Sequence, residues 1–580
     1  MKAYESYWLK KSNIVDWYKR PKKALLKKNF YLNWYPDGKI NIYSNCILKH
    51  IQSGNSNNVA LYFVNANKNI EKYSYSDLHK KVLSYEILLK KILRNKISSK
   101  KIMIQSSTSI EVVILILTCV KLGIEYSVIF EDLEFEGVKK RILLFKPDIF
   151  ISNKQKKNNI NYSRVIKLFT IEEINLESQK NIKLIYNYRD TVKYFSSNKS
   201  LFTLFTSGST GVPKGVVHST GGFLVYVKYT CMNQFGMTNK STIFTAADCA
   251  WLNGHNYALF GPLSIGAITV LIQNPMLLLD KEFLKKVLNI GVTILYLPVT
   301  LIRLMKSIFG KNDRFQTKNL KTLGSMGEHL APVVAQWFSE KFTQKNLCIV
   351  NAYYQTENGG IICSPKFNEK VNKVPHGSAG EPSSKIIKLN KLFKNKKNEL
   401  KIKTPWPGCM KKIITNNSSR EWKKYWDKNG NFRMFDLATK INKNIFIHGR
   451  TDDVINIRGK RIGCEEIESV VLQINEVEEC CAIGIEDYLE GNVLILFITS
   501  KKNIGISKIN KYISSNFGSF AIPQKIFFLK KIPKTKSGKI LRRLLRSIVQ
   551  DPKDSSCYGD LSTIQDKRIV SDIQNSIINH

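Results

Sequence analysis

The chain has 580 residues and a formal net charge of +44, and 43% of its residues are hydrophobic. This length allows several domain-sized units with a large apolar core, and the hydrophobic content is that of an ordinary soluble protein. Lysine supplies most of the positive charge, whereas arginine is the better residue for planar recognition of phosphate groups. Because no nucleic-acid-binding motif accompanies the charge, we interpret it as a solvated surface and expect no nucleic-acid partner.

The cysteines and the N-terminus indicate the compartment. The 11 cysteines contain no Cys-x-x-Cys pair and no Cys/His metal spacing, which favours reduced thiols in a cytosol-like compartment. The first residues, Met1–Trp8, hold no apolar segment of the kind that a secretory signal needs. The most apolar run, 112–120, is too short to cross a bilayer. The sequence therefore predicts a cytoplasmic location and no membrane partner.

Helix and strand patterns alternate along the first part of the chain. The apolar run over 112–122 predicts a helix that ends at Gly123. A second helix is expected from Pro298 to Ser307. This alternation is typical of an α/β fold with layered sheets and helices. Strands are expected over 124–130, 201–205, 292–297 and 347–350.

The later part of the chain has a different texture. The lysine-rich stretch 391–403 predicts a solvated insertion or hairpin. Beyond about residue 450 the chain has strand patterns of its own, over 482–485 and 493–497, and enough length for a small second domain. We therefore predict an N-terminal domain of residues 1–451 and a C-terminal domain of residues 452–580.

The segment Thr206–Gly215 combines glycines, hydroxyl side chains and one lysine, Lys214. Backbone N–H groups in such a loop point toward an anion, the hydroxyls add donors, and the lysine adds charge. The segment differs from the common P-loop, because Pro213 precedes the lysine and no Ser or Thr follows it directly. It predicts a polyphosphate site after the strand 201–205, with a flexible Gly/Ser connector as the alternative.

Four further segments suit a nucleotide, and each has an ordinary alternative. Gly324–His329 offers glycines against which a flat base can lie, or a strand-to-helix turn. Tyr353–Gly360 offers aromatic walls and a carboxylate suited to Mg²⁺, or the end of a core strand. Asp436 and Arg450 suit a ribose, or form a weak surface pair. Pro533–Arg543 offers a lysine that stabilises charge on a reacting acid and phosphate, or a solvated basic tail.

Together these segments resemble the adenylate-forming superfamily, and specifically the acetyl-CoA synthetase branch of the AMP-forming acyl-CoA synthetases. Weaker likeness covers 17–130 and 559–563, so the resemblance extends over nearly the whole chain. Each motif alone is moderately specific, and their common order makes the set very specific. The matching stretches are Thr206–Gly215, Thr245–Tyr257, Leu323–Glu328, Gln355–Glu357, Gly449–Arg461, Glu465–Ser469 and Pro533–Arg543.

The resemblance implies an α/β fold with a large, multi-subdomain N-terminal adenylate-forming domain and a small, mobile α+β C-terminal domain. It implies an acid–thiol ligase that joins a short-chain acid to coenzyme A, with ATP as co-substrate and Mg²⁺ as cofactor. The carboxylate attacks the α-phosphate and pyrophosphate leaves; the CoA thiol then attacks the acyl-adenylate and AMP leaves. The C-terminal domain would take a different pose in each half-reaction, with Asp452 as the hinge.

By the same resemblance, Lys539, Lys214 and Glu357 carry the catalysis, and Glu357 also holds Mg²⁺. In this family the lysine at the position of Lys539 is a site of inactivating acetylation, so a lysine acetyltransferase and a deacetylase are expected partners. The residues implied to bind ATP are Thr206, Ser207, Gly208, Ser209, Thr210, Gly211, Gly327, Glu328, His329, Asn351, Ala352, Tyr353, Tyr354, Gln355, Thr356, Asp436, Arg450 and Arg461.

The implied acid pocket is small. Acetate-selective relatives carry tryptophan where this chain has Tyr354 and valine where it has Met326, so one change opens the pocket and the other fills it. Because one methylene in such a pocket decides only about 1–3 kcal/mol, acetate is the first choice and propionate the second. The pocket residues are Trp251, Leu252, Asn253, Met326 and Tyr354.

The contacts to CoA depart most from the family pattern. Arg458, Gly459 and Asn253 keep the implied CoA positions. Where lysine replaces arginine, the charge is kept but the planar fork is lost. The replaced positions are Ser514 and Leu277 at the CoA site, Ile474 at a histidine of a proposed metal site, and Lys154, Lys156 and Lys157 at nucleotide-site arginines.

Two alternatives stay open from the sequence. One is an adenylate-forming ligase for another small acid or for a carrier-protein acceptor, against which the match over Trp251–Tyr257 argues. The other is a catalytically decayed relative that only binds ATP or polyanions, against which the intact lysines, carboxylates and arginine of the implied site argue.

Overall fold

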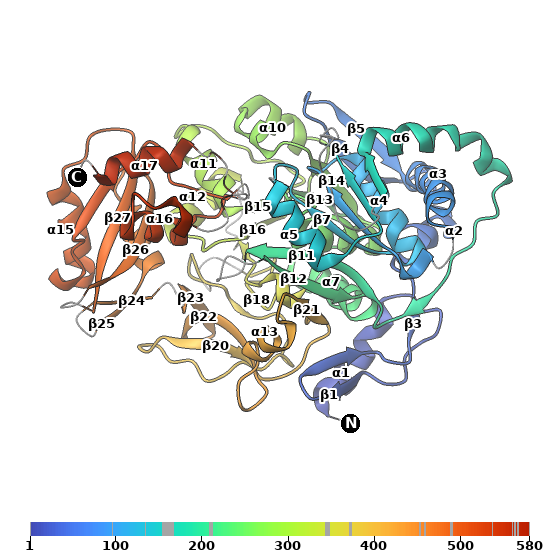
Figure 1. Cartoon of the computed structure of the whole chain (residues 1–580), viewed down its shortest axis with the longest axis horizontal. Coiled ribbons are helices and arrows are strands. Elements are labelled where there is room, and N and C mark those ends of the chain that lie inside the picture. The colour runs from blue at the N-terminus through green and yellow to red at the C-terminus, as the bar shows by residue number, and fades with distance from the viewer. Residues whose placement is uncertain are drawn as a thin grey trace.

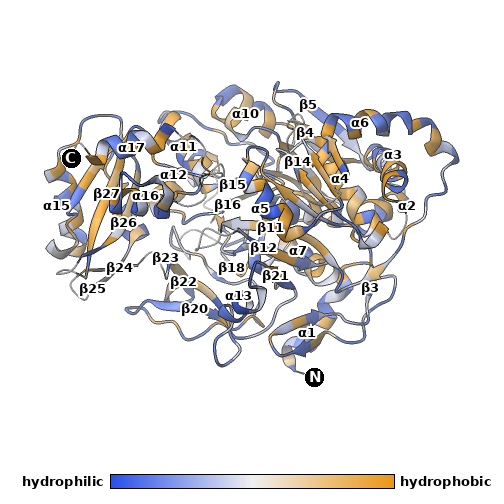
Figure 2. Cartoon of the chain, in the orientation of Figure 1, coloured by the Kyte–Doolittle hydropathy of each residue, from blue (hydrophilic) through white to orange (hydrophobic). Residues whose placement is uncertain are grey.

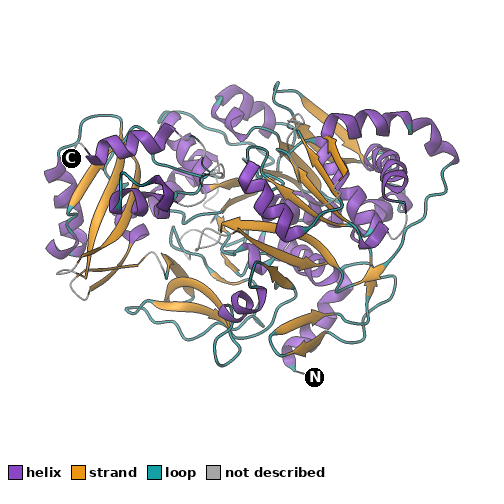
Figure 3. Cartoon of the chain, in the orientation of Figure 1, coloured by secondary structure: helices purple, strands orange, loops and turns teal. Residues whose placement is uncertain are grey.

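A computed structural model gives the fold, in which the C-terminal part lies beside a larger N-terminal body (Figure 1). Helices cover sheets on several sides, and long loops join them (Figure 3). The structure describes residues 2–578 except 95–96, 134, 154–166, 208–212, 343–348, 370–373, 452–453, 458–459, 488–490, 536–537, 559–560, 562–563, 565 and 567.

The first seven-stranded sheet carries the strand that was expected before the polyphosphate loop. Its strands are β6 (Lys101–Gln105), β7 (Glu125–Ile129), β8 (Ile149–Ser152), β9 (Lys167–Thr170), β11 (Ser200–Ser207), β12 (Pro213–Ser219) and β21 (Lys412–Ile414). Their order is β21-β12-β11-β7-β6-β8-β9, with β12 antiparallel to both of its neighbours and the other pairs parallel.

The second seven-stranded sheet is parallel except at one edge. Its strands are β4 (Val59–Val64), β5 (Ile70–Ser74), β13 (Thr242–Thr245), β14 (Ile268–Ile272), β15 (Ile294–Pro298), β16 (Thr322–Met326) and β17 (Val350–Asn351). The order is β17-β16-β15-β13-β14-β4-β5, and β5 alone runs antiparallel to its neighbour. Because parallel strands bury both faces, they read as continuous apolar runs, and Figure 2 shows these strands mostly in the hydrophobic colour.

The helices of the N-terminal body pack on these sheets. The most apolar one, α4 (Ile110–Leu122), is buried along most of its length and ends at Gly123, whose φ of 71° only glycine adopts without strain. A Cβ at Gly123 would lie 2.3 Å from the ring of Phe195. The others are α1 (Ala3–Lys11), α2 (Lys49–Gln52), α3 (Tyr75–Leu93), α5 (Phe135–Phe145), α6 (Ile171–Lys180), α7 (Thr220–Gln234), α8 (Leu252–His255), α9 (Gly261–Ile265), α10 (Lys281–Leu288), α11 (Val299–Ile308), α12 (Pro332–Phe342) and α13 (Ser418–Lys424).

A three-stranded sheet lies below the larger sheets in Figure 1 and consists of β20 (Asn398–Ile402), β22 (Phe432–Ile441) and β23 (Asn444–Arg450). Strand β20 forms the second half of the lysine-rich stretch, in which Leu400 and Ile402 are buried. The stretch is therefore partly a half-buried strand. Two-stranded ribbons complete the body: β1 (Leu25–Lys28) with β2 (Tyr31–Trp34), β3 (Lys39–Ile40) with β10 (Phe195–Ser196), and β18 (Cys363–Ser364) with β19 (Glu381–Pro382).

The elements from residue 454 onward, which we call the C-terminal unit, have two apolar clusters of their own. A sheet of β26 (Val477–Asp487), β27 (Gly491–Ser500) and β28 (Lys525–Phe528) separates the two clusters. The remaining elements are β24 (Val454–Ile457), β25 (Lys460–Gly463), α14 (Cys464–Val471), α15 (Ile506–Phe517), α16 (Arg542–Gln550) and α17 (Arg568–Ile578). The boundary after residue 451 stays a prediction, because Asp452 lies outside the described residues.

The α/β class with a large first part and a small second part is confirmed. Among the described helices, none combines the length and the apolarity that crossing a bilayer requires. Of the cysteines in the described part of the chain, Cys557 is exposed and the others are buried.

Candidate active site

The carboxyl ends of β15, β16 and β17 form one edge, because the three strands are parallel and adjacent. Open parallel sheets bind ligands at this end. Gly327 follows β16 with a φ of 89°, and a Cβ built on it would have no heavy atom within 4 Å. The backbone there is therefore open to a flat ligand; that a base binds there stays a prediction.

Hydrogen bonds between β16, β17 and a neighbouring loop stabilise this edge. The Ser325 hydroxyl donates to Asn351 Oδ1 at 3.1 Å, and Asn351 Nδ2 donates to the Ser378 carbonyl at 3.0 Å. The backbone N–H of Ala352 donates to the Ser325 carbonyl. Both ends of the Asn351 carboxamide are thus engaged, which leaves its plane, rather than its polar atoms, to face a neighbouring group.

Glu328 and His329 lie at the same edge beside a cation. Arg303 of α11 forms an ion pair with Glu328 at 2.6 Å, so the carboxylate is neutralised by the protein. Burial lowers the pKa of His329 to about 4, and the charge of Arg303 adds to this effect. The imidazole is therefore neutral at physiological pH.

Asp436 is the best-connected carboxylate of the site. It lies on β22 with 7% of its surface exposed, and its Oδ2 accepts hydrogen bonds from the Tyr353 hydroxyl at 2.5 Å and Gln355 Nε2 at 2.6 Å. Arg450 of β23 approaches Oδ1 at 3.8 Å. Burial raises the pKa of Asp436, and the charge of Arg450 opposes that rise. The arrangement fixes one carboxylate oxygen and leaves the other beside a cation, which suits a ribose diol.

Lys214 and Glu357 are joined through one tyrosine. Lys214 pairs on β12 with Thr206 of β11 and forms an ion pair with Glu421 of α13. Its Nζ lies 6.0 Å from the ring centre of Tyr425, whose hydroxyl donates to Glu357 Oε1 at 2.7 Å. The Thr356 carbonyl accepts a hydrogen bond from the buried His218. The structure thus brings these predicted phosphate and metal residues to one place.

Lys539 reaches the site from the C-terminal unit. Gly538, with a φ of 82°, makes a tight turn in which its N–H donates to Thr535 and the Lys539 N–H donates to the Thr535 hydroxyl. The turn lies against Thr300 of α11, whose hydroxyl donates to the Gly538 carbonyl at 3.4 Å. The positive charge of Lys539 lowers the pKa of Asp436, against the effect of burial. The two residues therefore share one electrostatic environment.

The acid-pocket residues lie next to one another. Asn253 Nδ2 contacts the sulfur of Met326 at 2.6 Å, and both side chains are buried. The hydroxyls of Tyr354 and Tyr296 are 3.2 Å apart, and both rings pack edge-on against Tyr257. Leu252 is buried, and Trp251 caps α8 and packs against Phe130. Large side chains therefore fill the space around the predicted acid.

For several predicted residues the structure gives only the backbone, only a position away from the site, or no description. The side chain of Ser207, and of Arg461 on β25, is not among the described atoms. Ile474 is a core residue of the C-terminal unit, Ser514 lies on α15, and Leu277 lies in a short turn of helix, Pro275–Leu279. The predicted residues outside the described parts are Lys154, Lys156, Lys157, Gly208, Ser209, Thr210, Gly211, Asp452, Arg458 and Gly459.

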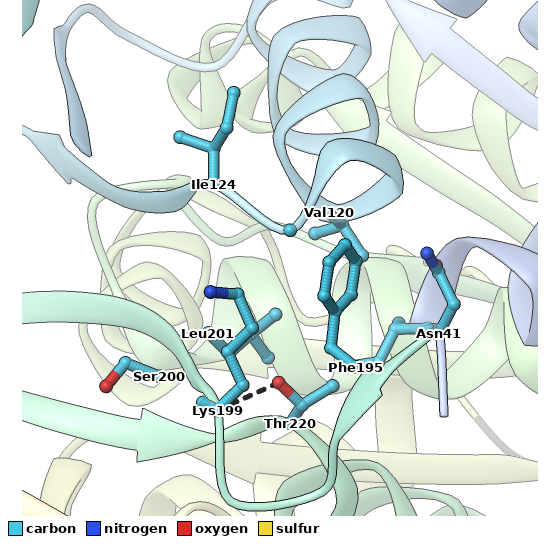
Figure 4. A pocket seen from close by; sticks show the side chains of 10 residues that line it. Asn41, Val120, Ile124, Phe195, Lys199, Ser200, Leu201 and Thr220 are labelled. Carbon is cyan, nitrogen blue, oxygen red and sulfur yellow. Dashed lines mark hydrogen bonds between the residues drawn. The ribbon is translucent and has the colours of Figure 1, made fainter. Parts of the chain in front are cut away.

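A small pocket at the other end of β11 does not belong to this site (Figure 4). It lies between the end of α4, the ribbon strand β10 and the start of β11, with Phe195 and Lys199 among its lining side chains. The Lys199 carbonyl accepts a hydrogen bond from the Thr220 hydroxyl, and Lys199 Nζ donates to the Ser98 carbonyl. Thr206 lies at the opposite end of β11, so the pocket is separate from the site.

The donor set fits a magnesium ion carried by phosphates. Within the described part of the chain, His, Cys, Asp and Glu side chains nowhere gather in threes that would hold a metal. Glu357 offers one carboxylate, and no described residue donates a hydrogen bond to its second oxygen. Mg²⁺ is commonly held by one or two carboxylates together with substrate phosphates and water. Glu357 alone therefore fits a metal that arrives with a nucleotide.

Sequence reasoning missed the residues that organise the site from other segments. Tyr425 and Glu421 hold Glu357 and Lys214, Arg303 holds Glu328, and Tyr296 meets Tyr354. Tyr296 lies within the strand expected over 292–297, but its partner is 58 positions away. No local sequence pattern predicts such pairings between distant residues.

Comparison with known proteins gives the class of this site. The chain matches the family described as AMP-binding enzyme over residues 48–395, and the AMP-binding enzyme C-terminal domain over residues 466–539. The chain therefore belongs to the AMP-binding enzymes, the adenylate-forming superfamily that its motifs resemble.

Particular relatives cover almost its full length. The acetyl-coenzyme A synthetase of Helicobacter pylori (strain G27) is 30% identical, over 99% of this chain and 93% of that protein. The acetyl-coenzyme A synthetase of Chlorobaculum tepidum is 28% identical over 98% of this chain and 91% of that protein. In fold, the chain is similar to acetoacetyl-CoA synthetase from Streptomyces lividans, with a TM-score of 0.80 and 15% identity over 99% of this chain and 93% of that one.

Proposed function

We propose that this enzyme joins a short-chain carboxylic acid to coenzyme A through an acyl-adenylate, releasing pyrophosphate and AMP, with acetate as the preferred acid and propionate next. The observation that carries the proposal is that four distant segments meet: Lys214 and Glu357 both lie against Tyr425, Gln355 beside Glu357 donates to Asp436, and the turn that carries Lys539 lies against Thr300. The full-length similarity to acetyl-coenzyme A synthetases supports the same activity.

In the adenylation step the chain's residues would hold charge and exclude water. Lys214 would leave Glu421 for the β- and γ-phosphates, and Tyr425 would orient Glu357. Asp436 and Arg450 would hold the ribose, and the base would lie over Gly327 beside the neutral His329. Mg²⁺ bound by Glu357 would neutralise phosphate charge when the nucleotide is present.

Lys539 would stabilise the charge that builds up as the acid attacks the α-phosphate. Preorganised positive charge at a reacting centre is commonly the largest single contribution to catalysis. Its turn is already seated against Thr300, close enough to Asp436 for the two charges to interact. Lys539 itself is exposed, so the expected acetyltransferase and deacetylase would have access to it.

The preference for a small acid follows from what fills the pocket. Met326 and Asn253 close one side, and the Tyr354–Tyr296 hydroxyl pair closes another. Because these side chains are large and closely packed, each additional methylene of a longer acid would have to displace a buried side chain.

The test is acid-dependent ATP–pyrophosphate exchange without CoA, followed by AMP release with CoA, for acetate, propionate and butyrate. Exchange with acetate and AMP release only with CoA are expected; exchange without CoA-dependent release would favour a carrier-protein acceptor. Lys539→Ala should lower exchange about 100- to 1,000-fold, whereas the exposed Lys530→Ala should not change it. Full activity of Lys539→Ala would show that its assigned role is wrong.

A further inference from the structure

The C-terminal unit is attached to the body by a three-residue ion cluster, which we call the Glu466 clamp: Glu466, Lys397 and His448. Glu466 lies on α14 of the C-terminal unit, and His448 lies on β23 of the body. His448 Nδ1 meets Glu466 Oε1 at 2.7 Å, and Lys397 Nζ meets Oε2 at 2.5 Å. Both carboxylate oxygens are thus held by the body.

The surroundings keep this clamp in one arrangement. The Thr439 hydroxyl lies 2.7 Å from His448 Nε2, so both ring nitrogens are engaged. The three side chains are 19–26% exposed, which shields the pair from solvent more than a surface ion pair. Burial alone would raise the pKa of Glu466, but the hydrogen bonds from His448 and Lys397 lower it below its ordinary value. Glu466 therefore stays charged.

Close packing also ties α14 to β23. A Cβ on Gly463, the residue before α14, would lie 2.5 Å from the His448 carbonyl oxygen. Only glycine lets the start of α14 approach the strand this closely. The clamp and this contact hold the same turn of the helix.

Hydrogen bonds connect α14 to the segment that follows Lys539. Glu468, two positions after Glu466 on α14, accepts two hydrogen bonds from Arg542 Nη2, at 2.7 and 2.6 Å. Arg542 begins α16, three positions after Lys539 in the sequence. Moving α14 therefore moves the turn that carries Lys539 relative to Asp436.

We propose that Glu466 is a positioning residue for the adenylation step: through Lys397 and His448 it holds α14, and with it the Lys539 turn, over the Asp436 site. This inference rests on the proposed function. Transfer of the acyl group from the adenylate to the thiol makes no use of Lys539 in that function, so the clamp matters for the first step alone. Lys397 thus helps to position the C-terminal unit, although the lysine-rich stretch around it suggests only a solvated surface.

The experiment compares the two half-reactions in the full chain carrying Glu466→Gln, which keeps the shape of the side chain and removes its charge. Hydrogen bonds to charged groups contribute more than neutral ones, so ATP–pyrophosphate exchange with acetate should fall about tenfold, in maximal rate rather than in KM for ATP. Transfer from supplied acetyl-adenylate to CoA should stay within about twofold of wild type.

Matched lysine variants locate the effect. Lys397→Met should slow exchange as Glu466→Gln does, whereas Lys396→Met, at the exposed neighbouring position, should not. The double variant Lys397→Met with Glu466→Gln should be less impaired than the product of the single effects, because both remove the same contact.

Each outcome decides between explanations. A wild-type protein without acid-dependent exchange would overturn the proposed function, and this inference with it. An active wild type with unchanged exchange in Glu466→Gln would overturn the inference alone. Equal slowing of exchange and transfer would assign Glu466 a purely structural role and would also overturn it.

Discussion

Replacing Arg542 by methionine is expected to loosen the C-terminal unit while leaving the N-terminal body intact. Arg542 and Glu468 have side chains that are 13% and 9% exposed, and they form an ion pair with three hydrogen bonds. Glu468 also accepts the Ala482 N–H at 2.8 Å, which ties α14 to β26. The substitution therefore removes the cation and leaves a carboxylate in an apolar surrounding.

The expected cost follows from the uncompensated charge. Removing one partner of a buried ion pair costs about 3–5 kcal/mol, whereas replacing both partners by apolar groups is often close to neutral. Burial already raises the pKa of Glu468, and the charge of Arg542 opposes that rise. Without Arg542 the pKa of Glu468 should rise further. A carboxyl whose pKa is raised on folding loses stability as the pH rises from its ordinary pKa to the raised one, so the deficit should shrink as the pH falls through that range.

The distribution of aromatic residues makes the measurement selective. All eight tryptophans lie at or before Trp426, so tryptophan fluorescence follows the body alone, while far-ultraviolet circular dichroism follows both parts. With a urea dependence of about 2 kcal/mol per molar, the loss should move the early circular-dichroism transition by about 2 M. The fluorescence transition should not move, and Arg543→Met, at the adjacent exposed position, should leave both unchanged.

Two results would refute this reasoning. A fluorescence transition that moves as far as the circular-dichroism transition would mean that the C-terminal unit does not unfold on its own. A midpoint unchanged in Arg542→Met, or no recovery when Glu468→Gln is added, would mean that the buried charge is not the source of the cost.

Four further predictions follow from single contacts. Tyr425→Phe keeps the ring but removes the hydroxyl that donates to Glu357, so exchange at limiting Mg²⁺ should fall about tenfold and recover partly at high Mg²⁺; equal loss at all Mg²⁺ concentrations would contradict this. Gly538→Ala places a Cβ 2.7 Å from Thr300 at a φ of 82°, so it should slow adenylation with little change in ATP affinity, measured by exchange and by nucleotide binding. Tyr354→Trp enlarges the aromatic wall and should shift the kcat/KM ratio toward acetate over propionate by about tenfold, and an unchanged ratio would remove Tyr354 from the pocket. Burial lowers the pKa of His218 and His329 to about 4, so as the pH falls these histidines take up protons in the unfolded chain before they do so in the folded one. The free energy of unfolding should therefore decrease as the pH drops from about 6.5 toward 4. In urea titrations, His218→Phe should reduce the pH dependence of that free energy by about 1.4 kcal/mol per pH unit.

Local patterns predicted much of the fold. The apolar run and the glycine cap predicted a helix end that matches the end of α4 at Gly123, the run expected over 201–205 lies in β11, and the run expected over 292–297 overlaps β15, which begins two residues later at Ile294. The lysine-rich stretch was harder, because charged residues surround the strand β20: Leu400 and Ile402 alternate with charged residues, yet both are buried in a strand that pairs with β22. Neither the sequence of β20 nor that of β22 shows that these two distant strands pair.

The same limit applies to the site. Motifs that are contiguous in sequence predicted roles for Lys214, Glu357 and Lys539, because within short segments a lysine suits phosphate and a carboxylate suits Mg²⁺. Tyr425 carries no such pattern, and its hydroxyl meets Glu357 across 68 positions. The arrangement of Glu466 with Lys397 likewise depends on how two bodies meet, which no periodicity records.

The single exposed thiol among the described cysteines, that of Cys557, offers a natural site for a fluorescent label. A maleimide dye on Cys557 would sit on the smaller body, while every indole donor sits on the larger one. With Cys348, which lies outside the described residues, replaced by alanine, energy transfer from indole to dye would test whether the smaller body moves relative to the larger one during turnover, without any engineered label site.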